Sequence, residues 1–202
     1  MRSLLFVALS FVSTTVLAES AKLKELPEDS KLVAALNEIL ENEDDCYFGD
    51  CNITSGKTSA SLWTVTKPVD KMSVAELKQL ESDAFAMDTF YNDDAEYVSK
   101  TKFTQKVYVL SGSDIKSIAA HIAESNDFDP RGGETVKEIS VTVRKIVKAL
   151  KEKKDTRVIV AMRRGLVKRP EDAGGNRYIT QYLLINAKTN NVLRLYLIEG
   201  HM

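Results

Sequence analysis

Cys46 and Cys51 are the two cysteines of the sequence, in the stretch CYFGDC that follows the acidic run ENEDD. Redox-active pairs usually have two residues between the thiols, and a zinc site needs four ligands, whereas the chain has two histidines. In an oxidising compartment two nearby thiols usually form a structural disulfide. We therefore predict a Cys46–Cys51 disulfide. The acidic residues around it lack the ligand spacing of a calcium-binding loop.

The first residues, MRSLLFVALSFVSTTVLA, indicate the compartment. A positive charge at Arg2 precedes an apolar stretch that is too short to span a bilayer as a helix. Small and β-branched residues precede a cleavage point after Ala18, as in a secretory signal peptide. We predict a signal peptide over residues 1–18 and a mature protein that begins at Glu19. That protein would be periplasmic or secreted, with no stable membrane insertion.

Residues suited to catalysis are sparse. His121 lies in a predicted helix without a recognisable nucleophile, and His201 is the penultimate residue. The sequence has no nucleophile elbow, metal-binding histidine pair, phosphate-binding loop or dinucleotide fingerprint. Carboxylate pairs are available from a run that is also typical of a solvated helix face: Asp83, Asp88, Asp93, Asp94 and Glu96. We predict a non-enzymatic protein without a cofactor or metal. The alternative is a small periplasmic hydrolase that uses His121 and acidic residues.

Basic residues offer a chemistry of anion binding instead. The segment RRGLVKRPEDAGGNR, 163–177, joins two predicted strands, and a long loop held by a sheet often carries a binding site. The segment PRGGE, 130–134, puts a cation before the first turn of a predicted helix, where unpaired N–H groups favour anions. We predict that these segments bind an envelope protein or an anionic small molecule or polymer. The candidate residues are Arg131, Arg163, Arg164, Lys168, Arg169 and Arg177. Alternatively, the charges of 163–177 only keep an exposed hairpin soluble.

Charge is unevenly distributed although the formal net charge is −1. Residues 19–99 carry 18 acidic and 7 basic side chains, a net of −11, whereas residues 134–169 carry 12 basic and 4 acidic ones, a net of +8. The two regions either attract each other within the fold or leave the basic segment to an anionic partner. Pairing between copies would give a homodimer, that is, a self-associating structural domain. A nucleic-acid partner is not expected, because the basic segment lacks interleaved aromatic residues.

The elements that position these residues predict an α+β fold. Apolar residues at helical spacing predict four helices, 30–41, 73–91, 113–124 and 134–152. Runs rich in β-branched and aromatic residues predict strands near 102–110, 157–163, 178–186 and 192–199. The last two strands are joined by AKTNN, a connection typical of a hairpin. We therefore predict a C-terminal antiparallel sheet with helices packed mainly on one face.

The predicted domain organisation has two parts after the signal peptide. Residues 69–202 form the α+β domain, and residues 19–68 form an N-terminal helix and disulfide loop. TSASLWTVT, residues 58–66, gives a weak strand signal before Pro68 interrupts regular structure. The sequence does not decide whether the N-terminal segment packs on the sheet or extends from it as an appendage.

Overall fold

The structure is a computed structural model that describes residues 21–27, 29–41, 60–87, 90–125, 133–171 and 175–201. Within these residues six strands form one antiparallel sheet in the order β1-β2-β6-β5-β4-β3. The strands are β1 (Leu23–Glu25), β2 (Ala60–Val65), β3 (Thr104–Val109), β4 (Val158–Val167), β5 (Arg177–Asn186) and β6 (Asn191–His201). The α-helices are α1 (Lys31–Glu41), α2 (Val74–Ala86), α3 (Phe90–Ser99), α4 (Gly112–Ser125) and α5 (Gly133–Lys151), with a short 3-10 helix, η1 (Val69–Lys71). The predicted α+β class with a largely C-terminal antiparallel sheet is confirmed.

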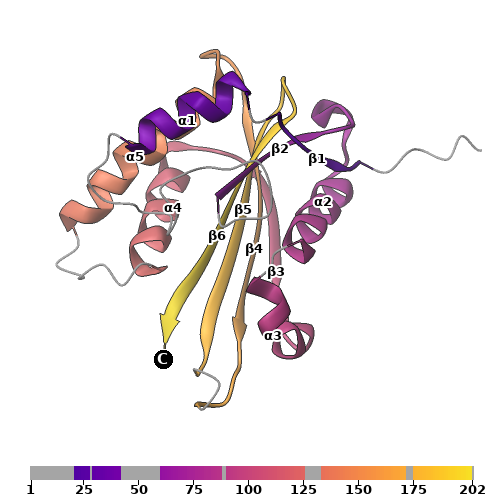
Figure 1. Cartoon of the computed structure of the whole chain (residues 1–202), viewed down its shortest axis with the longest axis vertical. Coiled ribbons are helices and arrows are strands. Elements are labelled where there is room, and N and C mark those ends of the chain that lie inside the picture. The colour runs from indigo at the N-terminus through magenta and orange to yellow at the C-terminus, as the bar shows by residue number, and fades with distance from the viewer. Residues whose placement is uncertain are drawn as a thin grey trace, which may run out of the picture.

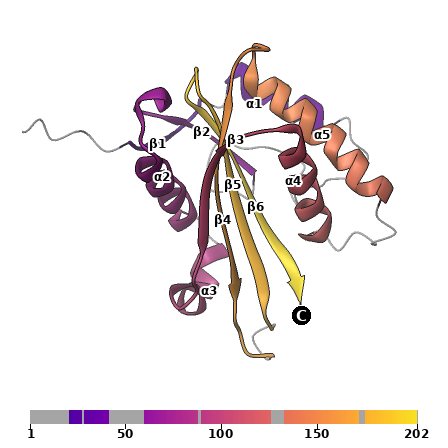
Figure 2. The same cartoon turned by 180° about the vertical axis from the view of Figure 1, so that it is seen from behind.

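Helices cover both faces of the sheet. Figure 1 shows α1, α4 and α5 on one side of the strands and α2 and α3 on the other, and Figure 2 shows the same layers from behind. Because neighbouring strand residues point to opposite faces, β5 buries Leu184 in the core with α4 and α5, and Leu183 and Ile185 in the core with α2. The sequence predicted helices mainly on one face of the sheet. α1, α4 and α5 share one face, and α2 and α3 pack on the opposite face.

The predicted helix 73–91 is divided into α2 and α3. Ser73 is the N-cap of α2 and forms a capping box with Glu76: Ser73 Oγ accepts from the Glu76 backbone N–H at 3.2 Å, and Glu76 Oε2 accepts from the Ser73 backbone N–H at 2.7 Å. The Lys67 ammonium and the Ser73 groups lower the pKa of Glu76 to about 2. α2 ends at Ala86, with Met87 as its C-cap, and α3 begins a new helix at Phe90.

The described part of the N-terminal segment packs on the sheet. β2 pairs with β1 on one side and β6 on the other, so it is an interior strand, and Trp63 in it is 2 % exposed. Three apolar residues of α1 are buried in the same core as residues of α4 and α5, namely Leu32, Val33 and Leu36. The segment that carries β1, α1 and β2 therefore contributes directly to the sheet and to its helical cover.

Candidate functional site

The loop between β4 and β5 is shorter than the sequence predicted, because β4 is longer. β4 continues to Val167, and its last two residues pair with Tyr178 and Arg177 of β5. Arg163 and Arg164 are therefore strand residues rather than loop residues, and 168–176 connects the strands. Because neighbouring residues of a strand point to opposite faces, the sheet separates the side chains of Arg163 and Arg164.

Arg163 belongs to a buried polar network under α2. Its Nε donates to Glu81 Oε2 at 3.0 Å, and its guanidinium lies 4.7 Å from the ring centroid of Phe85 and 5.2 Å from that of Phe103. Glu81 also accepts from Gln105 Nε2 at 2.6 Å and from Gln181 Nε2 at 2.9 Å. These contacts tie α2 to β3, β4 and β5, so Arg163 is committed to the packing of the sheet.

The Glu81 carboxyl is buried, which is unusual for an ionisable group. Its residue is 1 % exposed, and burial raises the pKa of Glu81 above its usual value, against the opposing effects of Gln105, Arg163 and Gln181. Removing a charge from water is costly even when a partner is present. The network therefore has a structural role that depends on all of its hydrogen bonds being made.

Arg164 lies on the other face, in a groove beside α4. This α4 groove has a volume of about 620 Å³ and is lined by Lys102, Thr104, Lys106, Ser117, His121, Met162, Arg164, Gly165, Leu166 and Tyr178. Among the described residues that line it, three side chains are cationic and none is an aspartate or a glutamate. The arrangement thus favours an anion over a cation or a neutral ligand.

The floor of the α4 groove is set by strand register. Thr104 of β3 lies opposite Arg164 of β4, and Leu166 of β4 lies opposite Tyr178 of β5. Arg164 and Tyr178 are consequently diagonal neighbours on one face, and the guanidinium lies 4.8 Å from the ring centroid. Stacking on an aromatic ring holds a guanidinium in a fixed plane, which favours directed hydrogen bonds from its edge to an oxyanion.

The wall of the α4 groove comes from α4 itself. Ser117 and His121 are four residues apart, so they lie on the same side of the helix. His121 Nδ1 forms a hydrogen bond with the Tyr182 hydroxyl, and the two rings are stacked with centroids 6.0 Å apart and an interplanar angle of 24°. The bond to Tyr182, which is itself 2 % exposed, anchors the imidazole beside the groove.

The other predicted binding residues lie elsewhere. Lys168 is exposed on the connection after β4, and the Arg169 guanidinium lies 5.8 Å from the Tyr97 ring of α3, on the α2 and α3 side of the sheet. Arg177 opens β5. The predicted cationic set is therefore divided, and of its described members Arg164 is the one that lines the α4 groove.

Several sequence predictions fall outside the described residues. These are the signal peptide, the Cys46–Cys51 disulfide and the candidate binding residue Arg131. They stay predictions.

Of the residues named for a hydrolase, Asp88 lies outside the described part of the chain. Asp83 and Glu96 lie on α2 and α3, across the sheet from His121 on α4. Within the described ranges, no group of three or more His, Cys, Asp or Glu side chains is placed to hold a metal ion.

Sequence reasoning missed two cations of the α4 groove, Lys102 and Lys106. The pattern that could have identified them is KFTQK, 102–106, in which every second residue points to one face of a strand and both ends are lysines.

Comparisons with known protein families, curated proteins and solved structures found no match, so function has to be inferred from these residues themselves.

Proposed function

We propose that the protein is an exported, non-enzymatic binding protein of the cell envelope that holds an anionic ligand in the α4 groove. The observation that carries the proposal is the lining of this groove, where Lys102, Lys106 and Arg164 come together and none of the described lining residues is acidic. Converging positive charge raises the local concentration of anions and speeds their association.

The remaining lining residues suit an oxyanion. Ser117, Thr104 and His121 supply side-chain donors at the wall and edge of the groove, and the Arg164 guanidinium lies over the Tyr178 ring. A carboxylate or phosphate group accepts short, charge-assisted hydrogen bonds from such donors. The ligand class supported by this chemistry is therefore a small molecule or polymer that carries carboxylate or phosphate groups.

Lys106 has a second role to consider, because it lies on β3, an edge strand of the sheet. Charged residues on an edge strand prevent pairing with the edge of another molecule. The two roles predict different phenotypes: loss of the edge protection gives aggregation with normal ligand affinity, whereas loss of the binding site gives a monodisperse protein with weakened affinity.

Calorimetric titration with sodium polyphosphate and with poly-glutamate tests the proposal. We expect saturable binding of at least one of these polymers, and Arg164→Ala and Lys106→Ala should each weaken it about tenfold or more, the loss of one hydrogen bond to a charged group. Lys116→Ala is the matched control, because Lys116 is an exposed lysine of α4 that does not line the groove. Equal affinities for the three variants, or no binding of either polymer by the wild type, would contradict the proposal.

A further inference from the structure

A second basic surface lies on the outer side of α5, away from the sheet. α5 buries its apolar side completely, with Ile139, Val143, Ile146 and Leu150 each at most 1 % exposed. The opposite side forms the α5 stripe, which we define as Lys137, Val141, Arg144, Lys148 and Lys151. These residues recur every three or four positions, so they run along one line of the helix for about 20 Å.

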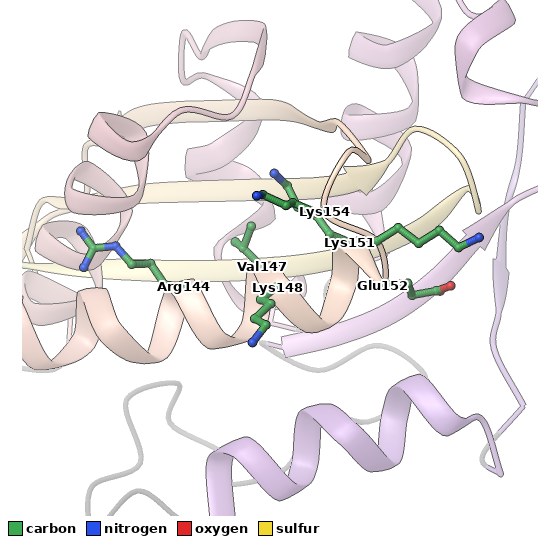
Figure 3. Close-up of a pocket in the computed structure, with 7 residues that line it drawn as sticks. Arg144, Val147, Lys148, Lys151, Glu152 and Lys154 are labelled. Carbon is green, nitrogen blue, oxygen red and sulfur yellow. The ribbon is translucent and has the colours of Figure 1, made fainter.

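The C-terminal half of the stripe opens into a shallow groove of about 500 Å³ (Figure 3). Five cations line it: Arg144, Lys148 and Lys151 from the helix, and Lys153 and Lys154 from the turn that follows. Val147 and Glu152 complete the lining. Figure 3 shows the labelled cationic side chains extending from α5 and from the turn that follows it, with Val147 among them.

Ordinary structural roles do not account for this cluster. Within the described residues none of the five cations makes an ion pair, and Glu152 is engaged by Asn191 Nδ2 at 3.5 Å. Cations in the last turn of a helix do favour its negative end, which accounts for Lys148 and Lys151. That effect fades beyond the last turn, so it accounts neither for Arg144 nor for Lys153 and Lys154.

The composition of the surface distinguishes between partners. Protein interfaces are enriched in tryptophan, tyrosine and arginine and depleted of lysine, whereas the α5 stripe and its groove are rich in lysine and have no aromatic residue. Lysine clusters of this kind are attracted to anionic lipid headgroups, and their stems lie well against the apolar part of an interface. Val141, 44 % exposed in the middle of the stripe, adds an apolar contact.

We infer that the α5 stripe and its groove bind the surface of an anionic phospholipid membrane. The contact is peripheral and reversible, because none of the helices in the described part of the chain is long and apolar enough to cross a membrane. This surface shares no lining residue with the α4 groove, so substitutions can test the two sites independently.

Vesicle co-sedimentation of the full chain tests the inference, with phosphatidylglycerol–phosphatidylcholine vesicles compared with pure phosphatidylcholine vesicles. The wild type should bind the anionic vesicles at low salt, leave them at high salt and ignore the neutral ones. Each basic residue near an anionic surface contributes about fivefold in affinity, so Lys148→Glu/Lys151→Glu should weaken binding about thirtyfold or more.

The matched control is Lys24→Glu/Lys71→Glu, which makes the same change of charge at exposed lysines of β1 and η1. The control should keep near-normal binding, and thermal unfolding followed by circular dichroism should confirm that both double variants fold. Three outcomes would overturn the inference: equal binding to neutral vesicles, equal loss in the control variant, or full competition by soluble glycerol phosphate at the same phosphate concentration.

Discussion

Glu81→Ala should lower the free energy of unfolding by about 3–5 kcal/mol, the loss expected when one partner of a buried ion pair is removed. The structure explains the size of this loss. The carboxylate accepts from Arg163 Nε at 3.0 Å, Gln105 Nε2 at 2.6 Å and Gln181 Nε2 at 2.9 Å. Alanine removes the acceptor of Arg163 Nε in a buried site, and a buried donor left unpaired costs about 1–3 kcal/mol, more when it is charged. Gln105 Nε2 keeps Lys78 O and Ser82 Oγ as acceptors, and Gln181 Nε2 keeps the backbone carbonyl of residue 81.

Glu81→Gln separates the charge of Glu81 from its hydrogen bonds. Burial raises the pKa of Glu81 above its usual value of 4.5, so the folded protein retains this proton at pH values where the unfolded chain has lost it. The stability that comes from protonated Glu81 is fully present below the unfolded pKa and is lost as the pH rises through the folded pKa. The wild type should therefore lose stability relative to Glu81→Gln as the pH rises from below 4.5 to neutrality.

Urea unfolding followed by the fluorescence of Trp63, the single tryptophan of the sequence, measures both effects. Asp83→Ala is the matched control, because Asp83 is an exposed carboxylate on the same helix, and its loss should change stability by no more than about 0.5 kcal/mol. The reasoning is refuted if Glu81→Ala behaves like this control, or if the difference between wild type and Glu81→Gln does not change with pH.

Three further substitutions test packing and local structure. Leu36→Ala should cost about 2–5 kcal/mol in urea unfolding, because Leu36 of α1 is fully buried; a loss near zero would show that α1 does not pack on the core. Gly165→Ala should cost about 1–3 kcal/mol, because its new Cβ would lie 2.7 Å from Phe103 Cδ1, and an unchanged Tm in calorimetry would contradict this packing. Ser73→Ala should cost about 1 kcal/mol by removing the cap of α2; full stability of this variant would mean that the cap is dispensable.

The helices and strands of the C-terminal half were predictable from periodicity. In α5 the residues at helical spacing are the buried ones, including Ile139, Val143 and Leu150. In β5 the eight residues from Ile179 to Asn186 are all buried, which a strand covered by helices on both faces requires. The consecutive apolar residues YLLI within β5 indicate that both faces of this strand are buried. The sequence therefore indicates that helices cover both faces of the sheet, although it does not show that α2 is the helix on the second face.

The candidate site was predictable only in part. The basic character of the segment after β4 is evident from the sequence, and Arg164 does line a groove. Arg163, the residue before Arg164, forms an ion pair with Glu81, which is 82 positions away in the sequence. No local sequence pattern predicts a partner at that separation. The groove also combines β3 with α4, and which strand lies beside β4 is determined by the pairing of the whole sheet.

A two-dimensional NMR titration of the full chain with sodium polyphosphate would test the binding site most directly, by following each backbone amide. If the α4 groove holds the anion, the largest shifts should cluster at 104–106, 164–166 and Tyr178. Arg164→Ala should move their titration midpoint about tenfold or more to higher polyphosphate concentration, while Lys116→Ala should leave the midpoint unchanged. Shifts centred on the α2 face around Glu81, or the same titration midpoint in Arg164→Ala as in the wild type, would contradict the assignment of the ligand to the α4 groove.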